Sequence, residues 1–121
     1  DVYTHNGGDL NVDHEMVHRA TVTSTRPLPG SNIEAIYTFE TLSSTEWSSA
    51  QQQFPFVPNR FVDISKHFDK KMAALKCYDT EMRPFPHPRS YEAVEALAKL
   101  RGAVSGMEKA ESFSVFRQVI K

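Results

Sequence analysis

The chain has 121 residues, of which 40% are hydrophobic and 24% charged, and its formal net charge is −1 at pH 7. This length suits one domain that buries roughly two thirds of its unfolded surface. The near-zero charge disfavours nucleic-acid binding, and no apolar run approaches the roughly 18 residues of a membrane span. The single cysteine, Cys77, is expected to be buried in a helix as a small apolar residue, and a reducing, cytoplasmic location fits.

The first third of the sequence predicts strand, helix and strand. Residues 1–4 are typical of the end of a strand, so the chain is expected to begin inside an element and a preceding segment to be missing. Asn11 is a suitable N-cap for a helix over residues 12–25. The β-branched and aromatic segment 33–42 predicts a half-buried strand. A strand end that feeds a helix is where open α/β sheets bind their ligands.

A polar segment then leads into a strand and a helix. Residues 48–58, rich in Ser, Gln and Pro, are predicted to form a mobile loop. Residues 60–64 are predicted to form a short strand, followed by a helix with Ser65 as its N-cap. The apolar stripe of that helix has the spacing of a core-facing surface and consists of Phe68, Met72, Leu75 and Tyr78.

The remaining sequence predicts two further helices. Ser90 is expected to cap a helix that ends near Gly102 or Gly106, and residues 111–120 are expected to form a final amphipathic helix. Alternation of strands and helices favours an α/β fold with a mainly parallel sheet covered by helices.

Residues 4–18 concentrate three histidines and two aspartates beside a Gly-Gly turn. His14 and His18 lie four residues apart, so on a helix both imidazoles project from one face at a spacing that can hold zinc. Two histidines are too few, because catalytic zinc normally takes three protein ligands. A helical histidine that is solvated or hydrogen-bonded within the structure explains the same residues.

Neighbouring polar residues also allow two interpretations each. Asp13 can orient the imidazole of His14 or simply stabilise the positive end of the helix dipole. Gly7 and Gly8 allow the backbone to approach a ligand closely, but they also make an ordinary turn. Arg89, in the Pro-His-Pro-Arg segment, can contact an anionic or sugar ligand or belong to a rigid surface turn.

The run Thr-His-Asn-Gly-Gly-Asp-Leu-Asn-Val-Asp-His at residues 4–14 resembles the second metal-site motif of the PIG-L/LmbE family of zinc-dependent N-deacetylases. Further blocks similar to bacterial LmbE-like members lie at residues 24–27, 41–47, 56–65, 86–90 and 100–102. The resemblance implies a Rossmann-like α/β fold. It also implies zinc as cofactor and hydrolysis of the N-acetyl group of an N-acetylglucosamine-type amino sugar or conjugate.

The family's other signature, a His-Pro-Asp-Asp segment after the first strand, supplies two metal ligands and the general base. The sequence does not contain it. Residues 1–121 are therefore identified as the C-terminal part of a single LmbE-like domain that lacks its N-terminal strands, and we expect this chain alone to be inactive. An exposed sheet edge favours self-association, so a homo-oligomer is possible in this interpretation.

Transferred position by position, the resemblance makes His14 the third zinc ligand and matches Asp13 to the aspartate that precedes it. Many members have a histidine, thought to stabilise the oxyanion, where this chain has Asn11. Our hypothesis is that His5 or Asn11 takes this role. We further expect four substrate-binding residues: Gly7, Gly8, Arg89 and Arg101.

Two other functions remain open from the sequence. The first is a non-catalytic module that binds a sugar or a protein and in which the Asp13–His14 pair is structural. The second is a plain metal-binding domain in which His5 and His18 join His14.

Overall fold

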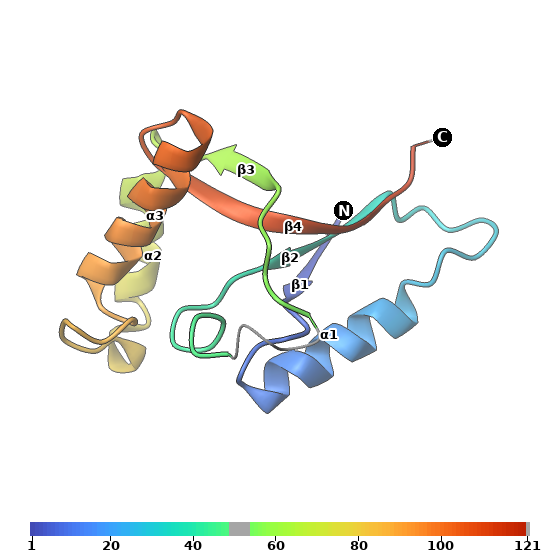
Figure 1. The fold of residues 1–121 in the computed structure, drawn as a ribbon, viewed down its shortest axis with the longest axis horizontal. Helices are drawn as coiled ribbons and strands as arrows, with labels where there is room; N and C mark the ends of the chain where they lie inside the picture. The colour runs from blue at the N-terminus through green and yellow to red at the C-terminus, as the bar shows by residue number, and fades with distance from the viewer. Residues whose placement is uncertain (49–53, 121) are drawn as a thin grey trace. The chain divides into compact units, whose positions relative to one another are not determined.

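The computed structural model describes residues 1–48 and 54–120. Its elements, in chain order, are β1 (Val2–His5), α1 (Val12–Ser24), β2 (Ala35–Phe39), β3 (Arg60–Asp63), α2 (Phe68–Lys76), the 3-10 helix η1 (Asp79–Glu81), α3 (Tyr91–Ser105) and β4 (Ala110–Gln118) (Figure 1). The described strands form one open sheet of four in the order β1-β2-β4-β3. The fold is a mixed α/β fold, as the alternation of elements predicts.

The sheet contains both strand directions. β1 pairs with β2 in parallel, with His5 opposite Phe39, whereas β4 pairs with β2 antiparallel. A mainly parallel sheet is therefore not confirmed. The chain divides into two compact units: Asp1–Arg60 with Phe113–Lys121, and Phe61–Ser112.

The first unit is organised around β2, which lies between β1 and β4. Ile36 is 0% exposed, and its strand neighbours Ala35, Tyr37 and Thr38 are also buried. The guanidinium carbon of Arg60 lies 4.1 Å from the centre of the Tyr37 ring. A cation over an aromatic face is attracted by the ring quadrupole and favours this packing.

Helix α1 contacts β1, where the hydroxyl of Thr4 donates to that of Thr21 at 3.3 Å. The side chain of Asn11 accepts from the backbone N–H of Asp13, so the predicted N-cap and helix are confirmed. No side chain of α1 is fully buried.

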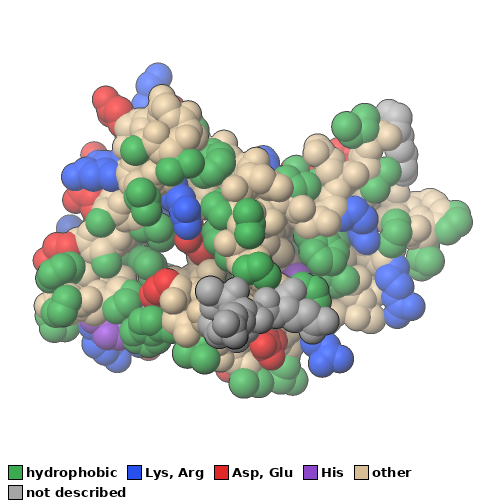
Figure 2. Space-filling view, viewed as in Figure 1, with side chains coloured by type: hydrophobic (Ala, Val, Ile, Leu, Met, Phe, Trp, Pro, Cys, Tyr) green, Lys and Arg blue, Asp and Glu red, His purple; other side chains and the backbone are tan. Residues whose placement is uncertain are grey.

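On the face shown in Figure 2, hydrophobic side chains lie among both acidic and basic ones. None of the helices in the described parts of the chain is long and apolar enough to cross a membrane.

In the second unit, α3 confirms the predicted helix. The hydroxyl of Ser90 accepts from the N–H of Ala93, and Gly106 ends the helix with φ 74°, a left-handed conformation that glycine adopts without strain. Gly102 is buried where α3 passes the backbone of Met107: a Cβ built on Gly102 would lie 2.6 Å from the Met107 carbonyl oxygen.

Charged side chains pair on α3 and next to it. Lys99 Nζ lies 3.0 Å and Lys109 Nζ 3.5 Å from Glu95 Oε1. The hydrogen bond and charge of Lys99, with a smaller contribution from Lys109, lower the pKa of Glu95. Lys109 also lies 4.0 Å above the centre of the buried Phe68 ring.

The predicted final helix at residues 111–120 is wrong, because Ala110–Gln118 is strand β4. Phe113, Val115 and Phe116 have the aromatic and β-branched side chains that favour strands. Pairing of residues 113–118 with β2 gives this segment backbone hydrogen-bond partners, and this tertiary contact overrides the amphipathic pattern of its sequence.

Three expectations for the segment around α2 are also corrected. Ser65 does not cap α2: its N–H and hydroxyl both donate to Asp63 Oδ1, and His67 takes the cap position. Tyr78 lies beyond the helix and is exposed. Cys77 is exposed rather than buried, because α2 ends at Lys76 and Cys77 is its C-cap. The predicted loop at residues 48–58 includes residues 49–53, which lie outside the described residues.

Candidate functional site

The candidate site lies where β1 and β2 end. Because these strands are parallel neighbours, residues 6–11 and 41–48 leave the sheet at the same edge, where α/β folds bind ligands. Hydrogen bonds join the two segments. The N–H of Leu10 donates to the Ser44 carbonyl at 3.3 Å, the N–H of Asn11 donates to the Ser44 hydroxyl at 3.2 Å, and the Ser48 hydroxyl donates to the Gly8 carbonyl.

A buried carboxylate and a histidine form the centre of the site. Asp9 is 1% exposed, and its Oδ2 lies 2.9 Å from Nδ1 of His14 on the first turn of α1. The Thr45 hydroxyl donates to Asp9 Oδ1 at 2.7 Å, and the Ser44 hydroxyl lies 3.3 Å from the same His14 nitrogen. An ionised carboxylate only accepts, so this contact favours the His14 tautomer with the proton on Nδ1 and the lone pair on Nε2.

His5, the last residue of β1, stacks on His14 with ring centres 4.0 Å apart and planes 19° from parallel. Burial, together with the charge of His14, lowers the pKa of His5, and Asp9 opposes this shift. The neutral imidazole is therefore favoured. Its Nδ1 atom is buried without a hydrogen-bond partner among the described residues.

His18 faces a different part of the loop. Its Nδ1 lies 2.9 Å from the carbonyl oxygen of His5, and its ring packs edge-on against Phe116 with centres 5.5 Å apart. A Cβ on Gly7 would lie 2.8 Å from Cδ2 and 2.9 Å from Nε2 of His18. Gly7 is therefore required here for the close approach of the histidine ring.

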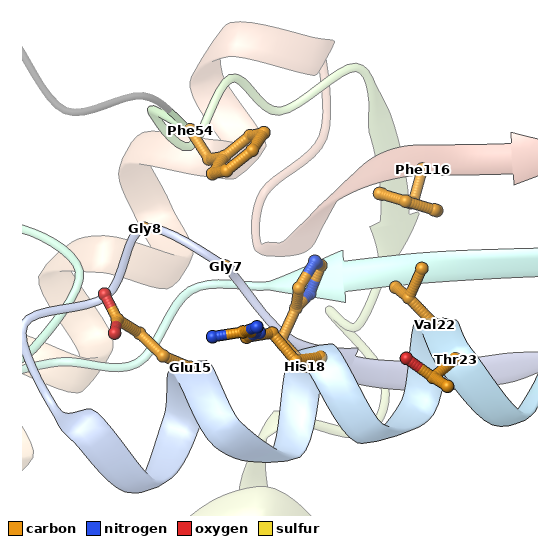
Figure 3. Close-up of a pocket in the computed structure, with 9 residues that line it drawn as sticks. Gly7, Gly8, Glu15, His18, Val22, Thr23, Phe54 and Phe116 are labelled. Carbon is orange, nitrogen blue, oxygen red and sulfur yellow. The ribbon is translucent and has the colours of Figure 1, made fainter.

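A pocket of about 690 Å³ opens beside this histidine. Figure 3 shows the side chains of His18 and Phe54 directed toward a common space above α1. The pocket is lined by Gly7, Gly8, Glu15, His18, Arg19, Val22, Thr23, Phe54 and Phe116. Aromatic walls with a few polar groups are typical of small-molecule sites.

The predicted site residues are distributed unequally. His5, His14, Gly7 and Gly8 lie together at the strand ends. Asn11 and Asp13 are exposed at the start of α1, and Asn11 Oδ1 accepts from the Asp13 N–H at 2.9 Å as the helix cap.

The two predicted arginines belong to the second compact unit. Arg89 Nη1 pairs with Glu81 Oε2 at 3.2 Å, while Arg89 Nε is buried without a partner among the described residues. Arg101 is half-buried on α3, where its backbone carbonyl accepts from the Ser105 hydroxyl at 2.8 Å. The first contact lies in the segment before α3, and the second lies within α3.

Sequence reasoning gave no role to Asp9, Ser44 or Thr45, which surround His14 in the structure. The polar segments that follow two adjacent predicted strands could have indicated these residues. If the two strands are parallel neighbours, the segments meet at one edge of the sheet.

The donor chemistry fits one position of a zinc site. A histidine that ligates metal usually donates its other ring N–H to a carboxylate or carbonyl, and the Asp9 carboxylate lies 2.9 Å from His14 Nδ1 in the position of such an acceptor. Within residues 1–48 and 54–120, however, no three His, Cys, Asp or Glu side chains are grouped to hold a metal ion. A complete zinc site would need additional ligands.

The arrangement can thus present an imidazole nitrogen of His14 beside a second imidazole and an aromatic-walled pocket. These are the groups for binding a metal ion or a polar small molecule, and they establish no reaction by themselves. Comparisons with models of known protein families and with curated proteins found no match to this chain.

Proposed function

We propose that this chain supplies part of the active site of a zinc-dependent hydrolase that removes the N-acetyl group from an N-acetylglucosamine-type sugar or conjugate. The observation that carries the proposal is the 2.9 Å contact between His14 Nδ1 and the buried Asp9 carboxylate, which prepares Nε2 as a metal ligand. The cofactor, the substrate class and a Rossmann-like parent fold come from the resemblance of residues 4–14 to the PIG-L/LmbE motif.

In this proposal, the residues of the chain have the following roles. His14 holds the metal through Nε2. Zinc, when bound, supplies Lewis acidity toward the amide carbonyl and toward water. His5, whose neutral form is favoured, donates an N–H to the substrate oxygen as charge develops there. His5 is better suited than Asn11 to stabilise the oxyanion, because His5 stacks on the metal ligand His14 whereas the side chain of Asn11 caps the helix. The general base is a carboxylate outside this chain.

The metal ligand can be tested on the chain itself. We expect titration with Zn²⁺ to shift the ring signals of His14 in NMR spectra, and His14→Ala to abolish saturable binding. His67→Ala, which removes an exposed histidine from the second unit, serves as the matched control. Equal zinc affinity of His14→Ala and the unmodified chain would exclude His14 as the ligand.

The reaction can be tested by measuring acetate release from N-acetylglucosamine. We expect none from this chain with Zn²⁺. In a longer protein in which a His-Pro-Asp-Asp segment precedes it, we expect turnover that His14→Ala abolishes. If His5 is the oxyanion donor, His5→Ala should lower that rate roughly a hundredfold or more, and Asn11→Ala much less. Turnover by the chain alone, or turnover independent of His14, would contradict the proposal.

A non-catalytic sugar-binding module is the second candidate, and the pocket beside Gly7 favours it. Phe54 and Phe116 provide apolar walls, while Arg19 provides a polar contact. Saturable binding of N-acetylglucosamine without zinc, retained in His14→Ala and lost in Phe116→Ala, would support the module.

A further inference from the structure

The position of Asp9 is unusual for a carboxylate. Its side chain is 0% exposed, and a buried charge is costly unless it is paired and hydrogen-bonded. Both oxygens have partners, because Oδ2 contacts His14 Nδ1 at 2.9 Å and Oδ1 accepts from the Thr45 hydroxyl at 2.7 Å. The buried carboxylate therefore links the loop after β2 to the first turn of α1.

The direction of this hydrogen-bond chain is fixed from one end. The backbone N–H of Thr41 donates to Thr45 Oγ1 at 2.7 Å, and the Thr45 hydroxyl donates to Asp9 Oδ1. An ionised carboxylate accepts at both oxygens, so the 2.9 Å contact at Oδ2 favours the His14 tautomer with the proton on Nδ1 and the lone pair on Nε2.

Other contacts limit rotation of the His14 ring. His5 stacks on one face with ring centres 4.0 Å apart, and the Ser44 hydroxyl lies 3.3 Å from Nδ1. That hydroxyl also accepts from the N–H of Asn11 at 3.2 Å, which anchors the start of α1. The tautomer and the orientation of the imidazole are thus set before any ligand arrives.

We propose that Asp9, oriented by Thr45, is a positioning residue that fixes His14 in the tautomer with Nε2 available to bind metal. This inference rests on the proposed function for the identity of the metal site, but the control of the tautomer depends only on residues of this chain. It assigns a role to the loop at residues 41–48, which residue spacing did not indicate.

The tautomer can be measured by ¹⁵N NMR of the histidine rings in the full chain, with His14→Ala for assignment. The unmodified chain should show protonated Nδ1. In Asp9→Asn the Thr45 hydroxyl still donates to the side-chain oxygen, so the amide NH₂ faces His14 and requires Nδ1 as acceptor. We therefore expect Asp9→Asn to switch His14 to the Nε2–H tautomer.

Two further variants separate this effect from general destabilisation. In the Asp9→Asn background, Thr45→Val removes the hydroxyl that orients the amide and should mix the tautomers of His14, whereas Thr45→Ser keeps the hydroxyl and should preserve the Nε2–H form. Thr4→Val is the matched control, because the Thr4 hydroxyl is also buried but bonds to Thr21. In a longer protein in which a His-Pro-Asp-Asp segment precedes the chain, zinc affinity measured by competition with a chelating dye should fall 10–100-fold in Asp9→Asn and remain unchanged in Thr4→Val.

The outcomes distinguish this inference from the proposed function. Retention of the Nδ1–H form in Asp9→Asn would overturn the role of Asp9, even if His14 binds zinc. If Asp9→Asn does not fold, Asp9→Ala, which removes the acceptor at His14 Nδ1, decides: a mixture of tautomers would support the role of Asp9, and retention of the Nδ1–H form alone would overturn it. A tautomer switch in a chain whose His14 binds no zinc would support Asp9 as the positioning residue and exclude the metal site.

Discussion

Gly7→Ala should destabilise the protein through His18. The new Cβ would lie 2.8 Å from Cδ2 and 2.9 Å from Nε2 of the His18 ring. Ordinary contacts between carbon atoms are about 3.5–4.0 Å, so the ring must retreat by roughly 0.7 Å. Its hydrogen bond to the His5 carbonyl, now 2.9 Å, would then lengthen beyond a useful distance.

The expected size follows from three contributions. Loss of the hydrogen bond costs about 1 kcal/mol, and overpacking costs about 1–3 kcal/mol. Gly7 does not have a positive φ, so alanine regains about 0.4–1 kcal/mol by restricting the unfolded chain. We expect Gly7→Ala to lower the free energy of unfolding by about 1–3 kcal/mol.

A double-mutant cycle with His18→Ala tests the mechanism, because additivity fails only for residues that interact. Without the His18 ring there is nothing to displace, and Gly7→Ala should then be neutral or stabilising by up to about 1 kcal/mol. Urea unfolding followed by circular dichroism gives all four free energies. An equal cost of Gly7→Ala in both backgrounds would refute the reasoning and would indicate another role for this glycine.

Three further predictions concern stability and charge. Gly102→Ala should lower the free energy of unfolding by about 1–3 kcal/mol, because its Cβ would meet the backbone of Met107 at 2.6 Å; a more stable variant in urea unfolding would contradict this. Ile36→Ala should cost about 2–5 kcal/mol and the matched Ile36→Val about 0.5–1.5 kcal/mol, because this side chain is 0% exposed. NMR titration should place the pKa of Glu95 below its ordinary 4.5, and Lys99→Met should raise it. Because the folded-state pKa is lowered, the contribution of Glu95 to the stability of the folded protein is present above pH 4.5 and is lost as the pH falls through its folded-state pKa. An unchanged titration of Glu95 in Lys99→Met would contradict the pairing.

The elements best predicted from sequence are those with local capping signals. Asn11 and Ser90 both accept the hydrogen bonds expected of N-caps, and Gly106 adopts the left-handed conformation expected at a helix end. The strand β4 was not predictable in this way, because its partner β2 lies about 75 residues earlier in the chain. A local sequence pattern does not predict the element correctly where a strand distant in sequence satisfies the backbone hydrogen bonds.

The candidate site was predictable only in part for a similar reason. The histidines and the Gly-Gly turn are concentrated in one short run of sequence, so His5, His14 and Gly7 could be identified as a group. Thr45 lies 36 residues from Asp9, and their contact depends on β1 and β2 being parallel neighbours with aligned ends. The sequence contains the polar residues but not the pairing that brings them together.

His18 connects the pocket to the stacked pair His5 and His14, and a last prediction follows from this connection. The His18 ring lies next to Gly7 and forms a hydrogen bond with the His5 carbonyl. The His5 ring in turn stacks on His14. Displacing His18 by Gly7→Ala should therefore shift the NMR ring signals of His5 and His14, although neither residue is altered. Thr23→Ala, an exposed change in the wall of the same pocket, should leave both signals in place. If Gly7→Ala moves only the His18 signals, the stacked pair is held independently of the pocket, and a ligand bound beside Gly7 would not influence His14 through this route.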